Sequence, residues 1–301
     1  MRLDLTEGSP FKLIFKFSLP ILIGNIFQQL YNMVDTIIVG KYLGVNALAA
    51  VGSTTALINM FVNLFIGVSL GANVLSARFY AAGKEREMSE TVHTAMTFAL
   101  ISGIVMVFVG LFCTRGALEL MDTPADVIDQ AALYMKIYFC SMPFFMLYNY
   151  GAAILRAVGD TKRPLLFLII SGAINAVLNL FLVIAFSMGV AGVAIATVIS
   201  QVISCVLVLW CLFTTDSCYR LQISKLGIKG EYLLQIFQVG IPAGIQSTVI
   251  TFSNVLLQFC VASGLAIFIR RKTNSIWPGV FIGTALVAFG MVSSNSIAMI
   301  I

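Results

Sequence analysis

Charged residues are scarce in this sequence. Of its 301 residues, 10% are charged and 59% are hydrophobic, whereas soluble domains carry about 25% charged and about 45–50% apolar residues. So few charges cannot cover a water-soluble globule of this length, which excludes the soluble-enzyme classes. We therefore predict an integral membrane protein. The net charge of +5 suits basic loops at one membrane face, and no basic patch indicates nucleic-acid binding.

The patterns of metal, redox and nucleotide sites are also missing. The sequence has one histidine, His93, and its six cysteines include no CxxC pair. These counts argue against a histidine-based metal site, and cysteines within apolar runs behave as small hydrophobes. No GxxxxGK[ST] loop occurs, so nothing supports ATP-driven transport. No cleavable signal peptide is evident. We expect no cofactor and no enzymatic activity.

Long apolar runs are abundant instead. A helix needs about 20 apolar residues to cross a bilayer, and these runs lack the alternation of strands. The predicted spans are 12–39, 51–76, 93–114, 131–155, 164–187, 189–213 and 232–257, with a last run at 276–301. The uncharged stretch from Tyr232 to Ile269 is either one overlong helix or a hairpin of two, which gives eight or nine spans. The predicted fold class is an all-α polytopic membrane bundle.

Lysine and arginine gather in alternate connections. The N-terminal flank and the segments after the second, fourth and sixth spans are rich in both, and the other connections are poorer. The positive-inside rule then places the N-terminus in the cytoplasm. We expect a multi-pass protein of the cytoplasmic (inner) membrane, in contact with membrane lipid.

The first span has a polar face. Asn25, Gln28, Asn32 and Asp35 are three or four residues apart and share one side of a helix. Lipid contact would be costly for this face, so it should point to the bundle interior or to water. Asp35 is the only acidic residue deep within an apolar span. Its carboxyl group is suited to bind a proton, or Na⁺ with help from amide oxygens. The alternative is a satisfied polar group near the outer helix end.

Other spans carry polar pairs as well. Asn59 and Asn63 in the second span, and Asn175 and Asn179 in the fifth, are each four residues apart. Such pairs either join helices or line a cavity. Polar faces on most spans favour a water-filled central cavity. The tyrosines Tyr31, Tyr138 and Tyr148 suit an aromatic cation pocket or interface anchoring.

A weak internal repeat relates the first span to the seventh. Pro20 and Asn32 recur as Pro242 and Asn254, each 222 residues later, and Gln246 lies between the second pair. Internal repeats are common in secondary transporters. Two matching positions alone are weak evidence for such a repeat, because Pro and Asn also recur by chance.

At these residues the chain resembles the MATE (multidrug and toxic compound extrusion) transporters, within a wider lipid-and-drug flippase superfamily. The resemblance covers residues 1 to about 258 in the family's order, and no family pattern is recognised beyond them. The matching segments are SLPILIGNIFQQLYNMVDTIIVGKYLG (18–44), LGANVLSARFYAAGK (70–84), LRAVGDTKRP (155–164), GAINAVLN (172–179), GVAGVAIATVISQ (189–201) and GIPAGIQ (240–246).

The resemblance implies two six-helix lobes around a central cavity and cation-coupled (H⁺ or Na⁺) antiport of amphipathic organic cations and drugs. It implies that Asp35 and Asn175 belong to the proton or sodium site. Asn179 stands where many relatives have aspartate, which leaves Asp35 as the main titratable group. We therefore assign Asp35, Asn175 and Asn179 to cation coupling. The expected cavity residues are Gln28, Asn32, Asn59, Asn63, Gln201 and Gln246.

The expected organisation is a first six-helix lobe at 1–213, a cytoplasmic linker at 214–230, the first helix of a second lobe at 231–258 and an unrecognised hydrophobic tail at 259–301. The family has about twelve spans, so two copies of this chain could in principle assemble the two lobes as a homo-oligomer. Two alternatives stay open. One is a flippase for lipid-linked sugars, which would need interior Arg and Lys that these spans almost lack. The other is an inactive truncated remnant.

Overall fold

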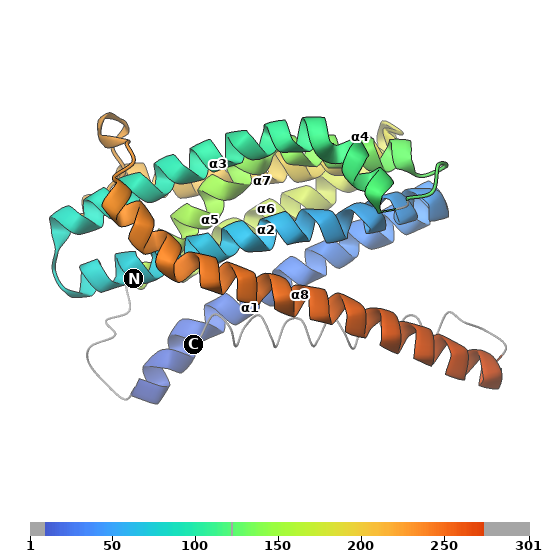
Figure 1. Cartoon of the computed structure of the whole chain (residues 1–301), viewed down its shortest axis with the longest axis horizontal. Coiled ribbons are helices and arrows are strands. Elements are labelled where there is room, and N and C mark those ends of the chain that lie inside the picture. Colours follow the sequence, from blue (N-terminus) through green and yellow to red (C-terminus); the bar gives the residue numbers. More distant parts are fainter. Residues whose placement is uncertain (1–9, 122, 274–301) are drawn as a thin grey trace.

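The computed structural model describes residues 10–121 and 123–273, and within them the chain is a bundle of helices without a strand (Figure 1). This confirms the predicted all-α class. The run at 276–301 lies outside the described residues. The elements are α1 (Pro10–Ile38), η1 (Val39–Leu43), α2 (Gly44–Ala81), α3 (Glu85–Leu120), α4 (Ile128–Cys140), α5 (Met142–Ala157), α6 (Lys162–Leu180), η2 (Phe181–Ala185), α7 (Gly189–Thr214), η3 (Ile223–Lys225) and α8 (Gly230–Thr273).

Five of the described helices are long and apolar enough to cross a membrane, and the bent pair α4–α5 makes a sixth. The sequence predicted one helix at 131–155, but α4 and α5 meet at an angle of 48°. Pro143 stands in the first turn of α5, where its missing N–H and rigid ring prevent a continuous helix. At the bend, the Tyr138 carbonyl accepts from the Ser141 hydroxyl at 2.6 Å and from the Ser141 N–H at 3.0 Å.

The uncharged stretch after residue 231 forms one helix in the structure and not a hairpin. Helix α8 runs without a break for 44 residues, which at about 1.5 Å per residue is roughly twice a bilayer core. Pro242 lies inside this helix. The described residues hold six candidate spans, counting α4–α5 as one, and α1, which the sequence predicted as the first span, is not among them.

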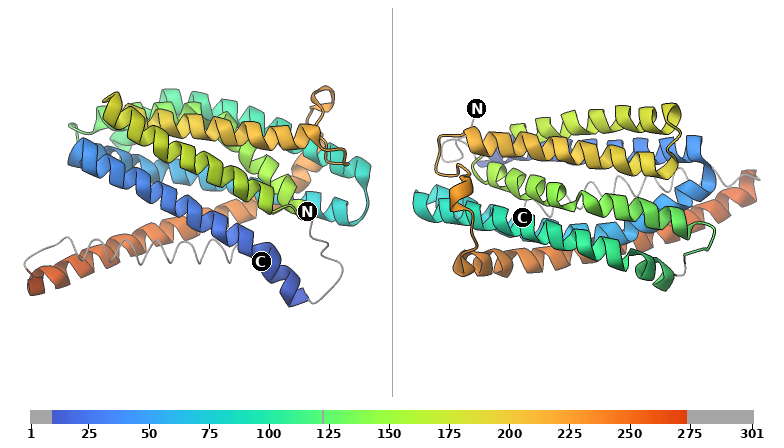
Figure 2. Two further views of the ribbon diagram at one scale, coloured as in Figure 1. Left: turned by 180° about the vertical axis from the view of Figure 1, so that it is seen from behind. Right: turned by 90° about the horizontal axis from the view of Figure 1, so that it is seen from above.

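The helices run back and forth between two ends of the bundle (Figure 1, Figure 2). One end, here called the basic end, carries the connections at 82–84, 158–161 and 215–229. Arginine and lysine lie in or beside each of these connections. The opposite end carries η1, η2 and the connection between α3 and α4. This alternation agrees with the alternating loop charges of the sequence.

The main apolar core lies among α2, α3, α5 and α7, and it includes the start of α8. Met96 of α3 and Tyr150 of α5 are almost fully buried there. The ring of Phe98 lies 6.0 Å from that of Tyr150 and 5.1 Å from that of Phe237, which belongs to α8. Burial of Ile236 beside Phe237 ties the first turns of α8 to the same core.

Helix α8 crosses α2 with the two backbones in direct contact. Gly67 and Gly71 of α2 face Gly240 and Gly244 of α8. A Cβ atom on Gly67 would lie 2.0 Å from the Gly244 Cα, and one on Gly240 would lie 2.6 Å from the Val68 Cα. Both pairs are GxxxG motifs, which permit close approach of helices in membranes. Dispersion contacts between backbones therefore hold this crossing.

This crossing should not tolerate a methyl group. Replacing Gly67 with alanine forces the two backbones apart, and overpacking of this kind costs about 1–3 kcal/mol of the free energy of unfolding. The matched control is Gly52→Ala in the same helix, where a Cβ meets nothing within 4 Å and where alanine favours helix by about 1 kcal/mol. Unfolding of both variants in detergent checks this expectation. Equal stability of the two would contradict the close α2–α8 contact.

Candidate functional site

The structure brings Asp35, Asn175 and Asn179 together where α1 packs on α6. The side-chain amide of Asn179 donates a hydrogen bond to Asp35 Oδ1 and another to Asn175 Oδ1 at 3.2 Å. Both asparagines are buried and Asp35 is half-buried. The four-residue spacing of the asparagines puts them on one face of α6, and that face meets the polar face of α1. The carboxyl group thus enters the bundle beside an amide donor.

Helix α7 completes this polar network. The Asn175 amide lies 3.4 Å from both Thr197 Oγ1 and Ser200 Oγ. The two hydroxyls themselves donate to backbone carbonyls of α7, at 3.1 Å for Thr197 and 2.8 Å for Ser200. Their oxygens are therefore left to accept from Asn175. Three helices are joined by one chain of hydrogen bonds that ends on the Asp35 carboxyl group.

Two amide oxygens near the network have no hydrogen-bond donor among the described residues. They are Asn179 Oδ1 and Gln201 Oε1, both buried. Leaving a buried acceptor unsatisfied costs about 1–3 kcal/mol, so such atoms usually accept from a water molecule or contact an ion or another ligand. Carboxylate, amide and hydroxyl oxygens are ligands that suit a hard cation. The carboxylate can bind a proton instead. Among the described residues, no three His, Cys, Asp or Glu side chains cluster as a metal site.

An apolar layer separates the network from the opposite end of the bundle. Val39, Val183 and Val193 are at most 5% exposed and pack in one cluster. Val39 on η1 follows Asp35, and Val183 on η2 follows Asn179, while Val193 on α7 precedes Thr197. Helix α1 passes into the π-helix η1 just after Asp35, and α6 passes into η2 just after Asn179, and π-helical turns often occur at functional sites. The described helices therefore close the network on this side.

Tyrosines form the neighbouring surface. Tyr31 and Tyr134 both lie within electrostatic range of Asp35. The Tyr134 and Tyr138 rings are stacked with centroids 6.2 Å apart, and the Gln201 side-chain NH₂ donates to the Tyr138 oxygen. The sequence singled out Tyr31 and Tyr138. It missed Tyr134, although the four-residue spacing from Tyr138 places both rings on one face of α4.

The other predicted cavity residues lie outside this network. The Asn63 amide donates to the Asn59 carbonyl of its own helix at 2.8 Å. Gln28 is half-buried on α1, whereas Asn32 and Gln246 are exposed on α1 and α8. Of the six cavity residues, the structure places Gln201 next to the site. The exposed pair lies on faces that the described helices leave uncovered.

Comparison with known proteins gives a consistent result. The MatE family model matches residues 20–181. The probable multidrug resistance protein YoeA of Bacillus subtilis (strain 168) is 32% identical over 248 residues, which are 79% of this chain and 53% of YoeA. The probable multidrug resistance protein YpnP of the same organism is 29% identical over 292 residues, which are 94% of this chain and 65% of YpnP.

A solved structure agrees as well. It is described as a transporter of the MOP superfamily from Pyrococcus furiosus in which reverse polarity of the binding pocket suggests a different function. Its TM-score is 0.82 at 25% identity, over 97% of this chain and 63% of that chain. The chain thus spans roughly half to two thirds of the length of these proteins. The YpnP alignment covers 94% of the chain and so extends into residues 259–301, where the sequence alone showed no family pattern.

The network should depend on the Asn179 amide. Asn179→Leu removes the donor to Asp35 and the donor to Asn175 Oδ1, so we expect a loss of about 1–3 kcal/mol in the free energy of unfolding. Asn32→Leu on the same face of α1 is the matched control, because Asn32 is exposed and its substitution should change stability by less than about 0.5 kcal/mol. Denaturant titration in detergent measures both. Equal effects would argue against the network.

Proposed function

The chain belongs to the MatE family of multi-pass membrane transporters, and from this premise we propose that it takes part in the export of amphipathic organic cations. Transporters of this family are not enzymes, so the proposed activity is movement of a substrate and not its conversion. The proposed coupling ion is H⁺ or Na⁺. The basic end would face the cytoplasm, with the N-terminus on that side of the cytoplasmic membrane, because basic residues collect on the inner face.

One observation carries the proposal: the Asp35 carboxyl group is held inside the bundle, beside an unsatisfied amide oxygen. Asn179 donates to Asp35 from one side, while Asn179 Oδ1 remains without a donor. A cation bound by Asp35 would satisfy both charge and oxygen at once. A proton on Asp35 would remove the charge instead. Either event changes the free energy of the same three-helix contact.

This arrangement supports a simple form of coupling. Binding of H⁺ or Na⁺ at Asp35 favours the packing of α1, α6 and α7 that best accommodates it, and substrate binding favours the other packing. The tyrosines beside Asp35 suit an organic cation, because aromatic faces and a carboxylate both attract positive charge. Competition between ion and substrate for one negative charge then gives antiport.

A central substrate cavity between two lobes needs a second wall besides the one that these helices supply. Asn32 of α1 and Gln246 of α8 are exposed in a single chain, although polar groups facing lipid are costly. We propose that a homo-oligomer covers these faces. The predicted cavity residues Gln28, Asn59 and Asn63 would line the same space at half-buried positions.

Asp35→Asn should abolish coupled export and leave membrane insertion intact. The substitution keeps the size of the side chain and removes the group that binds H⁺ or Na⁺. Efflux of ethidium from a drug-sensitive bacterium, at equal membrane levels of each variant, measures the effect. Glu119→Gln serves as the control, because Glu119 is an exposed acid in the last turn of α3, where it pairs with Arg115. Full efflux by Asp35→Asn would rule out the coupling role.

A further inference from the structure

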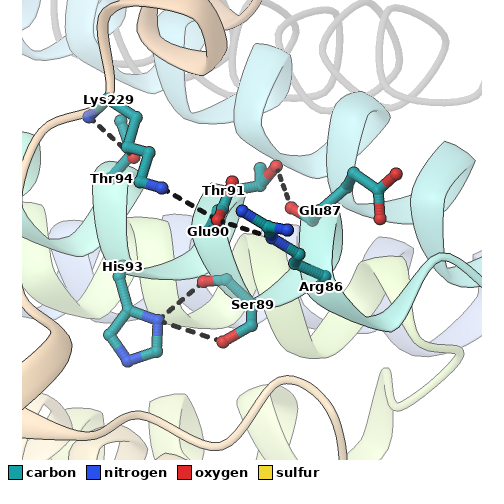
Figure 3. Close-up of polar contacts among 8 residues, drawn as sticks. All are labelled: Arg86, Glu87, Ser89, Glu90, Thr91, His93, Thr94 and Lys229. Carbon is teal, nitrogen blue, oxygen red and sulfur yellow. Dashed lines mark hydrogen bonds and ion pairs between the residues drawn. The ribbon is translucent and has the colours of Figure 1, made fainter.

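The segment 215–229, which joins α7 to α8, is fastened to the first turns of α3 (Figure 3). The Gln222 N–H donates to His93 Nε2 at 3.0 Å, and the Lys229 N–H donates to Thr94 Oγ1 at 3.2 Å. Side chains of α3 thus accept hydrogen bonds from the backbone of a segment more than a hundred positions later. The second contact lies at the last residue before α8 begins.

A charge pair strengthens the same attachment. Lys229 Nζ lies 2.8 Å from Glu90 Oε1, and Arg86 Nε lies 3.2 Å from the same oxygen. The Glu90 side chain is 20% exposed, whereas Glu119 at the other end of α3 is 61% exposed. Solvent therefore screens the Glu90–Lys229 pair less than it screens the pair that Glu119 makes. Glu90, His93 and Thr94 follow at i, i+3 and i+4 and share one face of α3.

His93 acts here as a fixed acceptor. Its Nδ1 lies 2.6 Å from the Ser89 carbonyl oxygen, so Nδ1 carries the hydrogen and Nε2 is free to accept from Gln222. The side chain is 3% exposed. The bond made by one ring nitrogen therefore sets the role of the other. The only histidine of the sequence is thereby used to hold a backbone amide.

Apolar burial holds the middle of the segment. Tyr219 and Leu221 are 1% and 4% exposed and belong to the main core. The Leu221 N–H also donates to the Leu212 carbonyl at 3.0 Å. The segment is therefore packed and bonded at several points, and α8 starts from a fixed position.

We propose that Glu90, His93 and Thr94 form a clamp that positions α8 against the six-helix bundle. The glycines of the α2–α8 crossing permit close approach of the two backbones, and burial of Ile236 and the contact of Phe237 with Phe98 hold the first turns of α8 against the core. The attachment at residue 229 adds a restraint where α8 begins. The three α3 residues are thus positioning residues. The clamp would position α8 whether or not the chain exports organic cations. Only an effect of the clamp on transport rests on the proposed function.

A distance measurement tests the clamp. Nitroxide labels would be attached at Leu120 and Val249, which are both exposed, in a full chain whose six native cysteines are replaced by serine. Double electron–electron resonance then measures the distance between α8 and the end of α3. We expect one narrow distance distribution for the parent protein. Glu90→Lys, Lys229→Glu and His93→Leu should each broaden or shift it. Combining Glu90→Lys with Lys229→Glu should restore it, and His93→Gln should retain it, because both keep the attachment.

Hydrogen exchange separates release of the clamp from general unfolding. His93→Leu should speed exchange of the amides at 222–236 by about tenfold, as expected for losing a buried hydrogen bond, with no change at 96–110 of α3. Arg115→Gln is the control, since it breaks the exposed pairs with Glu119 and Asp129 at the far end of α3 and should change neither readout. Unchanged distances in all single variants, or no recovery by the charge exchange, would overturn the proposal. Failure of the proposed function would appear separately, as absence of ethidium efflux from the parent chain.

Discussion

The structure depends first on the need to place one carboxyl group inside an apolar bundle. A carboxylate in such surroundings requires hydrogen-bond donors or a cation, because the cost of removing it from water is several kcal/mol. Asn179 supplies a donor, Asn175 holds Asn179, and Thr197 and Ser200 hold Asn175. The contact of three helices is thus organised around the charge state of one side chain.

The surroundings of Asp35 differ from one side of the carboxyl group to the other. Val39, Val183 and Val193 close the side toward one end of the bundle. On the neighbouring side Asp35 interacts electrostatically with Tyr31 and Tyr134 instead. A group that is closed off on one side and bordered by aromatic rings on another can exchange one positive ligand for another, which is the physical basis of the proposed antiport. The same packing forces would transmit that exchange to α6 and α7, because packed helices shift as units.

Much of this arrangement could be predicted from the sequence, because it follows from local patterns. Run length gave the helices, and the four-residue spacing of Asn175 and Asn179 indicated a shared face. The Ser141 bend was missed because Pro143 has the same sequence signal in a kinked span as in a broken one. The two GxxxG motifs can be read directly, but their pairing across α2 and α8 cannot. The hydrogen bond between His93 and Gln222 joins residues 129 positions apart, so no local sequence pattern predicts it.

The most direct test of the central claim is whether substrate binding is linked to an ion through Asp35. Ethidium binding to the purified chain in weakly buffered detergent solution would be followed by fluorescence, together with proton release and the effect of added Na⁺. The account predicts that dye binding releases protons or is weakened by Na⁺, and that Asp35→Asn removes this dependence, since linkage is reciprocal. Dye binding by Asp35→Asn with the same ion dependence as the parent protein would contradict the account.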